Sequence, residues 1–297
     1  MGAIDGVLEG AVDLHCHSGP SPFPRRIDHA EAARQADSLK FRAVVVKSHH
    51  HNTVMDVRAM APWSLDGVGT ELFGGIALNS HVGGLNLHAV ELSLQMGGKI
   101  VWFPTISAGK HMDHHDSHPN LKFPKATVKL SPPGRLSILD DAGNVKDVVR
   151  DILAAIKEAD AVVACGHMAT DQIHALLETA GEMGITKLLV NHPEYVIEAG
   201  ADDIASFAAK GAVIEHSLCM YDEESGFYHW DVAELVKWIE LVGPERTSLG
   251  SDLGQVNNPL PIESYRKIGA ALLDSGISEA DLKTMVAGNP AHLLSLD

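Results

Sequence analysis

The sequence predicts an α/β protein that folds as one (β/α)8 TIM barrel, and two observations support this prediction. Short apolar runs bounded by Gly, Pro or His alternate with longer segments of helical period, which is the pattern of repeated βα units. The chain has 297 residues, close to the roughly 250 residues plus insertions of a typical barrel. Because no shift in composition marks a second domain, we expect one barrel domain over residues 1–297.

Eight apolar runs are the candidate strands of the barrel. The first four are AVDLHCH ending at His17, FRAVVVKSH ending at His49, LFGGIALN ending at Asn79 and KIVWFPTIS ending at Ser107. The second four are AVVACGHMA ending at Ala169, KLLVNHP ending at Pro193, AVIEHSL ending at Leu218 and TSLGSDLG ending at Gly254.

Amphipathic helices are expected between these runs, because apolar residues recur three and four positions apart. The predicted helices cover residues 28–40, 85–96, 145–159, 171–183, 202–210, 231–241 and 261–274. A last helix is predicted in AGNPAHLLSL. There Asn289 can cap the helix, and Pro290 suits the first helical position because its missing N–H would have no partner.

The interval between the fourth and fifth strands is the longest and differs in composition. Residues 108–135 are rich in Pro and His, and we interpret them as a long loop insertion, since long loops in compact domains often serve as functional lids. Its histidines are expected to lie mainly in a solvated loop. His111 is kept as a candidate contact for the substrate or the metal.

The overall charge limits the classes of partner. The 39 Asp and Glu residues outnumber the 23 Lys and Arg residues, giving a net charge of −16. We therefore expect a small-molecule substrate, with neither nucleic acid nor an anionic membrane as the main partner. The sequence leaves a homo-oligomer open.

The sequence also predicts where the protein resides. The N-terminus has no basic leader, and no run approaches the ~18 apolar residues of a membrane span. The three cysteines lie in or just after strand-like runs and are expected to be reduced. We therefore expect a soluble, cytoplasmic protein.

Candidate metal ligands lie at the C-terminal ends of the predicted strands, which is where the active sites of (β/α)8 barrels are found. They are His15 and His17 on the first run, His167 on the fifth, His192 on the sixth and Asp252 on the eighth. Residues two apart on a strand face the same side, so His15 and His17 can both face the barrel axis while Cys16 faces the helices.

This set of residues suits a divalent cation. A single histidine would ordinarily be a structural residue, but five ligand-type residues at strand ends would each need a separate explanation. Imidazole nitrogen and carboxylate oxygen are ligands of zinc, the metal expected first, and they also suit iron, manganese or nickel.

Five motifs give the chain a resemblance to the amidohydrolase superfamily: VDLHCH, ACGH, LVNHP, LGSD and the terminal NPAHLL. The resemblance implies that His15, His17, His167 and Asp252 hold the first metal. It further implies that His192 holds a second metal or polarises the substrate, and that Asp252 carries a proton from the attacking water to the leaving group. A carboxylate beside a metal is chemically suited to this role.

The sequence departs from the common two-metal pattern of that superfamily. IVWFPTIS lacks the bridging Lys or Glu, and Lys47 instead ends the second run. A carbamylated Lys47 bridging two metals and an ordinary lysine binding an anionic substrate both stay open. We expect one firmly held metal, with a second left open.

Further side chains are candidate contacts for the substrate. His49 shares strand parity with Lys47, whereas His50 and His51 begin a loop and are expected to face solvent. Glu215 and His216 end the seventh run, where strand alternation lets only one of them face the axis cleanly.

A Pro-rich loop after the first strand, SGPSPFPRR, holds two more candidates. Its residues Arg25 and Arg26 hint at an anionic substrate, although exposed arginines usually belong to the surface.

The leading prediction is a metal-dependent hydrolase acting on an amide, a lactone or another ester. No dinucleotide fingerprint, P-loop or G-x-S-x-G elbow supports another chemistry. Three alternatives stay open: a metal-dependent decarboxylase or lyase on the same scaffold, a phosphoesterase with a larger metal cluster, and a barrel that binds metal without turnover.

Overall fold

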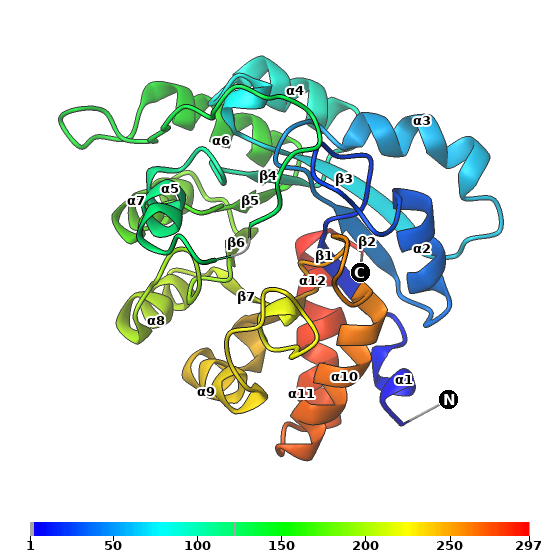
Figure 1. The fold of residues 1–297 in the computed structure, drawn as a ribbon. Helices are drawn as coiled ribbons and strands as arrows, with labels where there is room; N and C mark the ends of the chain where they lie inside the picture. The colour runs from blue at the N-terminus through cyan, green and yellow to red at the C-terminus, as the bar shows by residue number, and fades with distance from the viewer. Residues whose placement is uncertain (1–2, 122, 297) are drawn as a thin grey trace.

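The computed structural model describes residues 3–121 and 123–296, and it confirms the predicted (β/α)8 barrel (Figure 1). Eight parallel strands lie side by side in the order in which they occur in the chain. A parallel bridge between Cys16 and Leu253 joins the last strand to the first, with the His17 N–H donating to the Leu253 carbonyl at 2.7 Å. This contact closes the sheet into a barrel.

The eight strands lie on the eight predicted runs. They are β1 (Val12–Cys16), β2 (Ala43–Val46), β3 (Glu71–Ala77), β4 (Ile100–Trp102), β5 (Val162–Ala164), β6 (Leu188–Asn191), β7 (Val213–Ser217) and β8 (Thr247–Gly250).

Seven predicted helices are confirmed with small shifts at their ends. They are α2 (His29–Asp37), α4 (Leu87–Gln95), α6 (Asp147–Glu158), α7 (Thr170–Glu182), α8 (Ala201–Ala209), α9 (Val232–Val242) and α10 (Pro261–Asp274). Helix α2 begins at a capping box, in which the Asp28 side chain accepts from the Glu31 N–H at 2.7 Å and the Glu31 side chain accepts in return.

Sequence analysis missed four short helices: α1 (Ala3–Leu8), α3 (Val54–Ser64), α5 (Gly109–Ser117) and α11 (Glu279–Lys283). Helix α3 lacks a clear apolar face, because it contains Pro62 and leaves Trp63 exposed. Helix α5 lies inside the stretch predicted as a loop, where its many polar residues hid its helical period. Short 3-10 helices follow β3 and β7 and precede β8, and a π-helical segment precedes α12: η1 (Ser80–Val82), η2 (Leu218–Met220), η3 (Pro244–Arg246) and η4 (Thr284–Gly288).

The predicted cap of the last helix is wrong. Asn289 is the first residue of α12 (Asn289–Leu293), and the backbone enters it from η4 already in helical conformation, so no capping position exists. The Asn289 side chain instead donates to the carbonyls of Pro244 (2.8 Å) and Thr247 (2.7 Å) at the start of β8.

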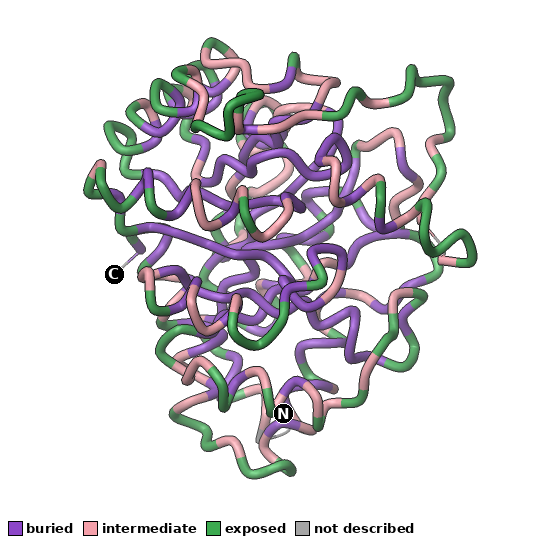
Figure 2. Tube along the Cα trace, turned by 90° about the vertical axis from the view of Figure 1, so that its left-hand side faces the viewer, coloured by how far each residue is buried: buried purple, intermediate pink, exposed green. Residues whose placement is uncertain are grey.

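The core consists of the barrel interior and the layer between the sheet and the helices. Alternate residues of β1 to β7 form one buried cluster with Leu293, Leu294 and Leu296. Lys99, just before β4, donates to the Leu294 carbonyl, so the end of the chain covers the amino-terminal mouth of the barrel. Figure 2 shows the buried strands at the centre of the molecule.

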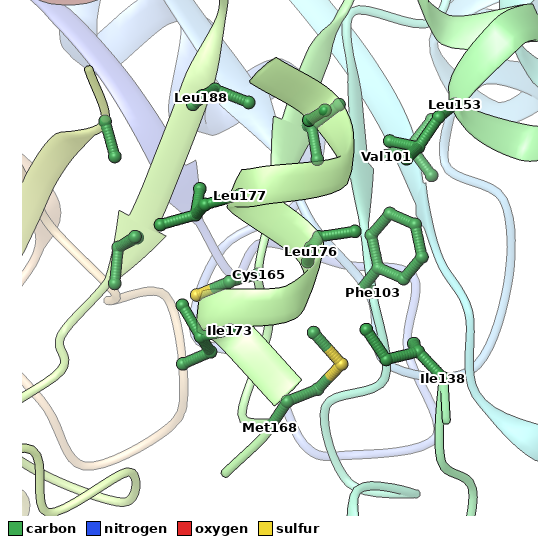
Figure 3. Packing of buried hydrophobic residues seen from close by; sticks show 14 of the residues in the cluster. Val101, Phe103, Ile138, Leu153, Cys165, Met168, Ile173, Leu176, Leu177 and Leu188 are labelled. Atoms are coloured by element: carbon green, nitrogen blue, oxygen red, sulfur yellow. The ribbon is translucent and has the colours of Figure 1, made fainter. Parts of the chain in front are cut away.

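The outer layer packs helices against the other face of the sheet. Figure 3 shows Ile173, Leu176 and Leu177 of α7 in one cluster with Val101 of β4, Cys165 just after β5 and Leu188 of β6. The three cysteines are buried and unpaired with one another. Within the described part of the chain, no helix is both long and apolar enough to cross a membrane.

We predict that Gly75 in β3 is required for close packing of neighbouring strands. A Cβ atom there would lie 2.2 Å from the Ile100 carbonyl oxygen and 2.6 Å from the Trp102 ring. Gly75→Ala should lower the free energy of unfolding by about 1–3 kcal/mol or more.

The matched control is Gly181→Ala in α7, where a Cβ meets nothing within 4 Å. This change should stabilise the protein by up to about 1 kcal/mol, because alanine favours helix. Guanidinium unfolding followed by circular dichroism measures both effects, and equal stability of the two variants would refute the packing argument.

Candidate metal centre

The predicted polar side chains gather at the carboxyl-terminal end of the barrel, around one cavity. Its empty volume, including the open mouth, is about 540 Å³. The described residues lining it are His15, His17, Phe23, Arg25, His49, His111, His115, Phe123, Pro124, His167, His192, Tyr195, Val196, Met220, Phe227, Asp252 and Gln255.

An irregularity in β1 sets the direction of His15. The pairing of β1 with β2 shifts register between Asp13 and Cys16. Leu14 belongs to the cluster inside the barrel, yet the next side chain, His15, also points inward to Glu215. A bulge of this kind re-aims a side chain that simple alternation would turn outward.

Asp13 braces this irregular segment. Its carboxylate accepts from the backbone N–H groups of His15 and Ser251, both at 3.0 Å, and from the Ser251 hydroxyl at 2.5 Å. Burial raises the pKa of Asp13 to about 6. Sequence analysis did not single out Asp13, although a carboxylate inside an apolar strand was a usable signal.

His15, His17 and Asp252 form a compact group of ligand atoms, all within 4.8 Å of one another. Asp252 Oδ1 lies 3.4 Å from His15 Nε2 and 3.1 Å from His17 Nε2. Two ligands held at about 2.0–2.1 Å by a tetrahedral zinc ion are roughly 3.3–3.4 Å apart. The three atoms therefore fit one divalent cation.

The other ring nitrogens of the two histidines have partners that orient the rings. His15 Nδ1 donates to Glu215 at 2.7 Å, and His17 Nδ1 donates to the Lys47 carbonyl at 3.0 Å. Burial lowers the pKa of both imidazoles well below 6.5, which favours their neutral form. Each ring thus directs an Nε2 lone pair toward Asp252, as in metal sites with supporting carboxylates or carbonyls.

The backbone at two predicted ligands is unusual. His192 and Asp252 have φ angles of 29° and 52°, a region that non-glycine residues rarely adopt. The Asp252 N–H donates to the His15 carbonyl at 2.7 Å and the His192 N–H donates to the Glu215 carbonyl at 2.6 Å. These bonds hold both residues at the rim of the barrel, where such strain often accompanies function.

His167 and His192 lie at the edge of the compact group rather than within it. Their ring centroids are 5.0 Å apart, and His192 Nε2 is 3.9 Å from Asp252 Oδ2. His167 Nε2 and His192 Nδ1 are buried without a hydrogen-bond partner among the described residues. The structure thus unites three of the four predicted first-metal ligands and leaves His167 beside them with an uncommitted nitrogen.

His49 and His111 also line the cavity, as predicted for substrate contacts. His49 Nδ1 is held by the Thr105 hydroxyl at 2.8 Å. His111 lies on α5, with Nδ1 at 2.9 Å from His167 Nδ1. The expectation of a solvated loop is therefore wrong for His111 and His114, because α5 folds over the cavity and buries them. It is confirmed for His118, which is exposed.

The expectation that His50 and His51 face solvent is wrong for His50. Its ring is buried between Phe23 and His81, with centroid distances of 4.6 and 4.7 Å, because the loop after β2 folds back against its neighbours. His51 is part-buried and bonds Asp56 at 2.7 Å.

Lys47 is fully buried and reaches the ligand group rather than the open cavity. Its Nζ lies 3.0 Å from His15 Nε2. Burial lowers the pKa of Lys47 to about 8, and a cation beside it would further favour the neutral amine.

Glu215 and His216 lie behind the cavity wall. Glu215 Oε1 accepts from both His15 Nδ1 and Asn191 Nδ2, the latter at 2.8 Å, and burial raises its pKa to about 7. His216 Nδ1 bonds Glu194 at 2.8 Å. Both side chains, predicted as substrate contacts, thus support other residues, and Glu215 is the one that meets the ligand group.

The aromatic wall of the cavity escaped sequence analysis. Phe23, Phe123, Tyr195 and Phe227 come from separate loops. No spacing in the sequence relates them, because only the folded barrel brings those loops to one mouth.

Comparisons with solved structures support the fold. An amidohydrolase from Pseudomonas aeruginosa has a TM-score of 0.65 at 13% identity, with 98% of this chain and 97% of that chain covered. A probable dipeptidase from the same organism has a TM-score of 0.63 at 11% identity, covering 98% and 96%. A mutant organophosphorus hydrolase from Deinococcus radiodurans has a TM-score of 0.55 at 14% identity, covering 97% and 94%.

The resemblance to the amidohydrolase superfamily therefore holds at the level of the fold. No curated protein shows a significant match to the sequence. One family model does match, over residues 10–215, a span from just before β1 into β7 that contains every predicted site residue except His216 and Asp252. On this evidence, the chain belongs to DUF6282, a family of unknown function.

Proposed function

We propose that this protein is a metal-dependent hydrolase that uses a metal-activated water on an amide, lactone or other ester bond of a small molecule. The observation that carries the proposal is the compact group of His15, His17 and Asp252, with both imidazoles oriented by partners on their far nitrogens. Zinc is the metal that this donor set suits first.

The proposed roles follow from what each side chain can reach. A divalent ion held by His15, His17 and Asp252 would supply an activated water and polarise a carbonyl oxygen. Asp252 is 15% exposed, against 1% and 3% for the two histidines. It can therefore accept a proton from the attacking water in the cavity and pass it to the leaving group.

His192 and His167 flank this group on the cavity side. Both line the cavity and hold a buried nitrogen without a partner in the described part of the chain. His192 is the nearer to Asp252, at 3.9 Å, and is placed to polarise a substrate oxygen. His167 can complete the ligand set.

The names of the similar structures support hydrolysis in general, because amidohydrolase, probable dipeptidase and organophosphorus hydrolase are all hydrolases. They differ in substrate, so the bond type rests on the present proposal alone. A cytoplasmic location and a homo-oligomer stay predictions from the sequence.

The first prediction concerns metal content. Elemental analysis of the purified wild type should find about one divalent ion per chain, and His15→Ala or Asp252→Asn should lose most of it, because each removes one of three clustered ligands. His88→Ala, whose side chain is 93% exposed, is the control and should bind like the wild type. A wild type that takes up no metal when supplied with zinc would end the hydrolase proposal.

The second prediction concerns Glu215 as a positioning residue for His15. Replacing it should weaken metal affinity about 10–100-fold, measured by competition with a chelator. Glu215→Leu should be worse than Glu215→Gln, since glutamine retains an oxygen that can accept from His15 Nδ1. Unchanged affinity in Glu215→Leu would show that His15 does not need this partner.

The third prediction concerns activity. Metal-loaded enzyme should hydrolyse members of an amide, ester and lactone panel, and Asp252→Asn should lower kcat at least about 100-fold, because it removes both a metal ligand and the proposed proton acceptor. Release of carbon dioxide from a carboxylated substrate without any hydrolysis would favour a decarboxylase instead.

A further inference from the structure

Arg25 stands on a loop that is held firmly against the rim of the barrel. The loop after β1 is pinned by an antiparallel bridge between Arg25 and Gln255, and the Arg26 N–H donates to the Gly254 carbonyl at 2.8 Å. At its base, the Gly19 N–H donates to the Ile27 carbonyl at 2.9 Å. The backbone that carries Arg25 is thus fixed on both sides.

The half-buried Arg25 side chain lines the cavity and forms no salt bridge with any described residue. Its Nε and Nη2 atoms are buried and make no hydrogen bond to any described residue, and its Cζ lies 5.9 Å from the Phe23 ring. Burial lowers its pKa to about 10, so it remains a cation at neutral pH.

The neighbouring Arg26 behaves in the ordinary way for a surface arginine. It is exposed, donates to the Asn258 carbonyl at 2.6 Å and lies 3.6 Å from Glu263. Of the two arginines that hinted at an anionic substrate, Arg25 lines the cavity and Arg26 does not. Buried N–H groups without a hydrogen-bond partner are costly, and this cost is recovered when an anion accepts from them.

Apolar side chains from the segments after β1, β4, β6 and β7 line much of the rest of the cavity. Phe23, Phe123, Val196, Met220 and Phe227 line the same cavity. Among the described residues of its lining, Arg25 is the only lysine or arginine. The cavity therefore pairs one forked cation with an apolar surface.

We propose that Arg25 binds the carboxylate of a small aromatic or otherwise apolar substrate, with the bond to be cleaved lying toward His15, His17 and Asp252. The second part rests on the proposed function. A guanidinium matches a carboxylate through two parallel hydrogen bonds. The guanidinium of Arg25 is already partly balanced by the negative charge of Asp252. It should therefore bind a carboxylate, with one negative charge, better than a phosphate with two.

The test is calorimetric titration with 3-phenylpropionate, its neutral analogue 3-phenylpropionamide, and phenylphosphonate. The full-length wild type at its measured metal content should bind the carboxylate about tenfold or more tightly than the amide. Arg25→Met should abolish this preference, Arg25→Lys should retain part of it, and Arg26→Met, the matched control, should leave it unchanged. Thermal melting checks that each variant is folded.

Repeating the titrations after chelation separates this inference from the metal proposal. The Arg25-dependent preference should persist without metal, even if the protein proves to bind none. A preference that survives Arg25→Met but disappears on chelation would assign carboxylate binding to the metal and overturn the proposal. Absence of any preference in the wild type, or tighter binding of phenylphosphonate, would also overturn it.

Discussion

Closure of the barrel between β8 and β1 is the constraint on which the site depends. The bonds from the Asp252 N–H to the His15 carbonyl and from the His17 N–H to the Leu253 carbonyl join the two ends of the sheet. They also bring a carboxylate from one end of the sequence beside two imidazoles from the other. The relative position of the three candidate metal ligands therefore depends on this junction between β8 and β1.

The Asp13 carboxylate adds hydrogen bonds to the junction between β8 and β1 that strand pairing does not supply. It satisfies backbone donors on both sides of the junction, at His15 and at Ser251, where the register of β1 is irregular. Without such a partner, those buried N–H groups would carry the cost of unsatisfied polar atoms. One buried side chain thus supports the bulge, the closure and the direction of His15.

Burial in this site also affects the charge of the imidazoles, because it lowers the pKa of His15 and His17. It favours neutral imidazoles, the form that binds metal, while Glu215 and the Lys47 carbonyl decide which nitrogen faces the cavity. The Nε and Nη2 atoms of Arg25 have no hydrogen-bond partner among the described residues. The same holds for His167 Nε2 on the cavity side and for Glu215 Oε2 and His216 Nε2 behind the cavity wall.

The sequence by itself determined the architecture and located most residues of the candidate site. The short apolar runs predicted the positions of all eight strands, and the polar residues at their ends predicted the candidate site: His15, His17, His167, His192 and Asp252. Both signals are local and repeat along the chain, so they can be found without the tertiary structure. The role of Asn289 and the exposure of His50 were misjudged, since each depends on contacts with other elements.

Only the tertiary structure decided how the candidate residues divide their tasks. The bulge in β1 sends Leu14 and His15 to the same side, Glu215 turns out to support His15, and α5 carries His111 over the cavity. It also places Arg25 in the cavity wall, with two buried nitrogen atoms, and leaves the adjacent Arg26 exposed. Local sequence cannot encode these outcomes, because each depends on which distant loop or strand occupies the neighbouring space.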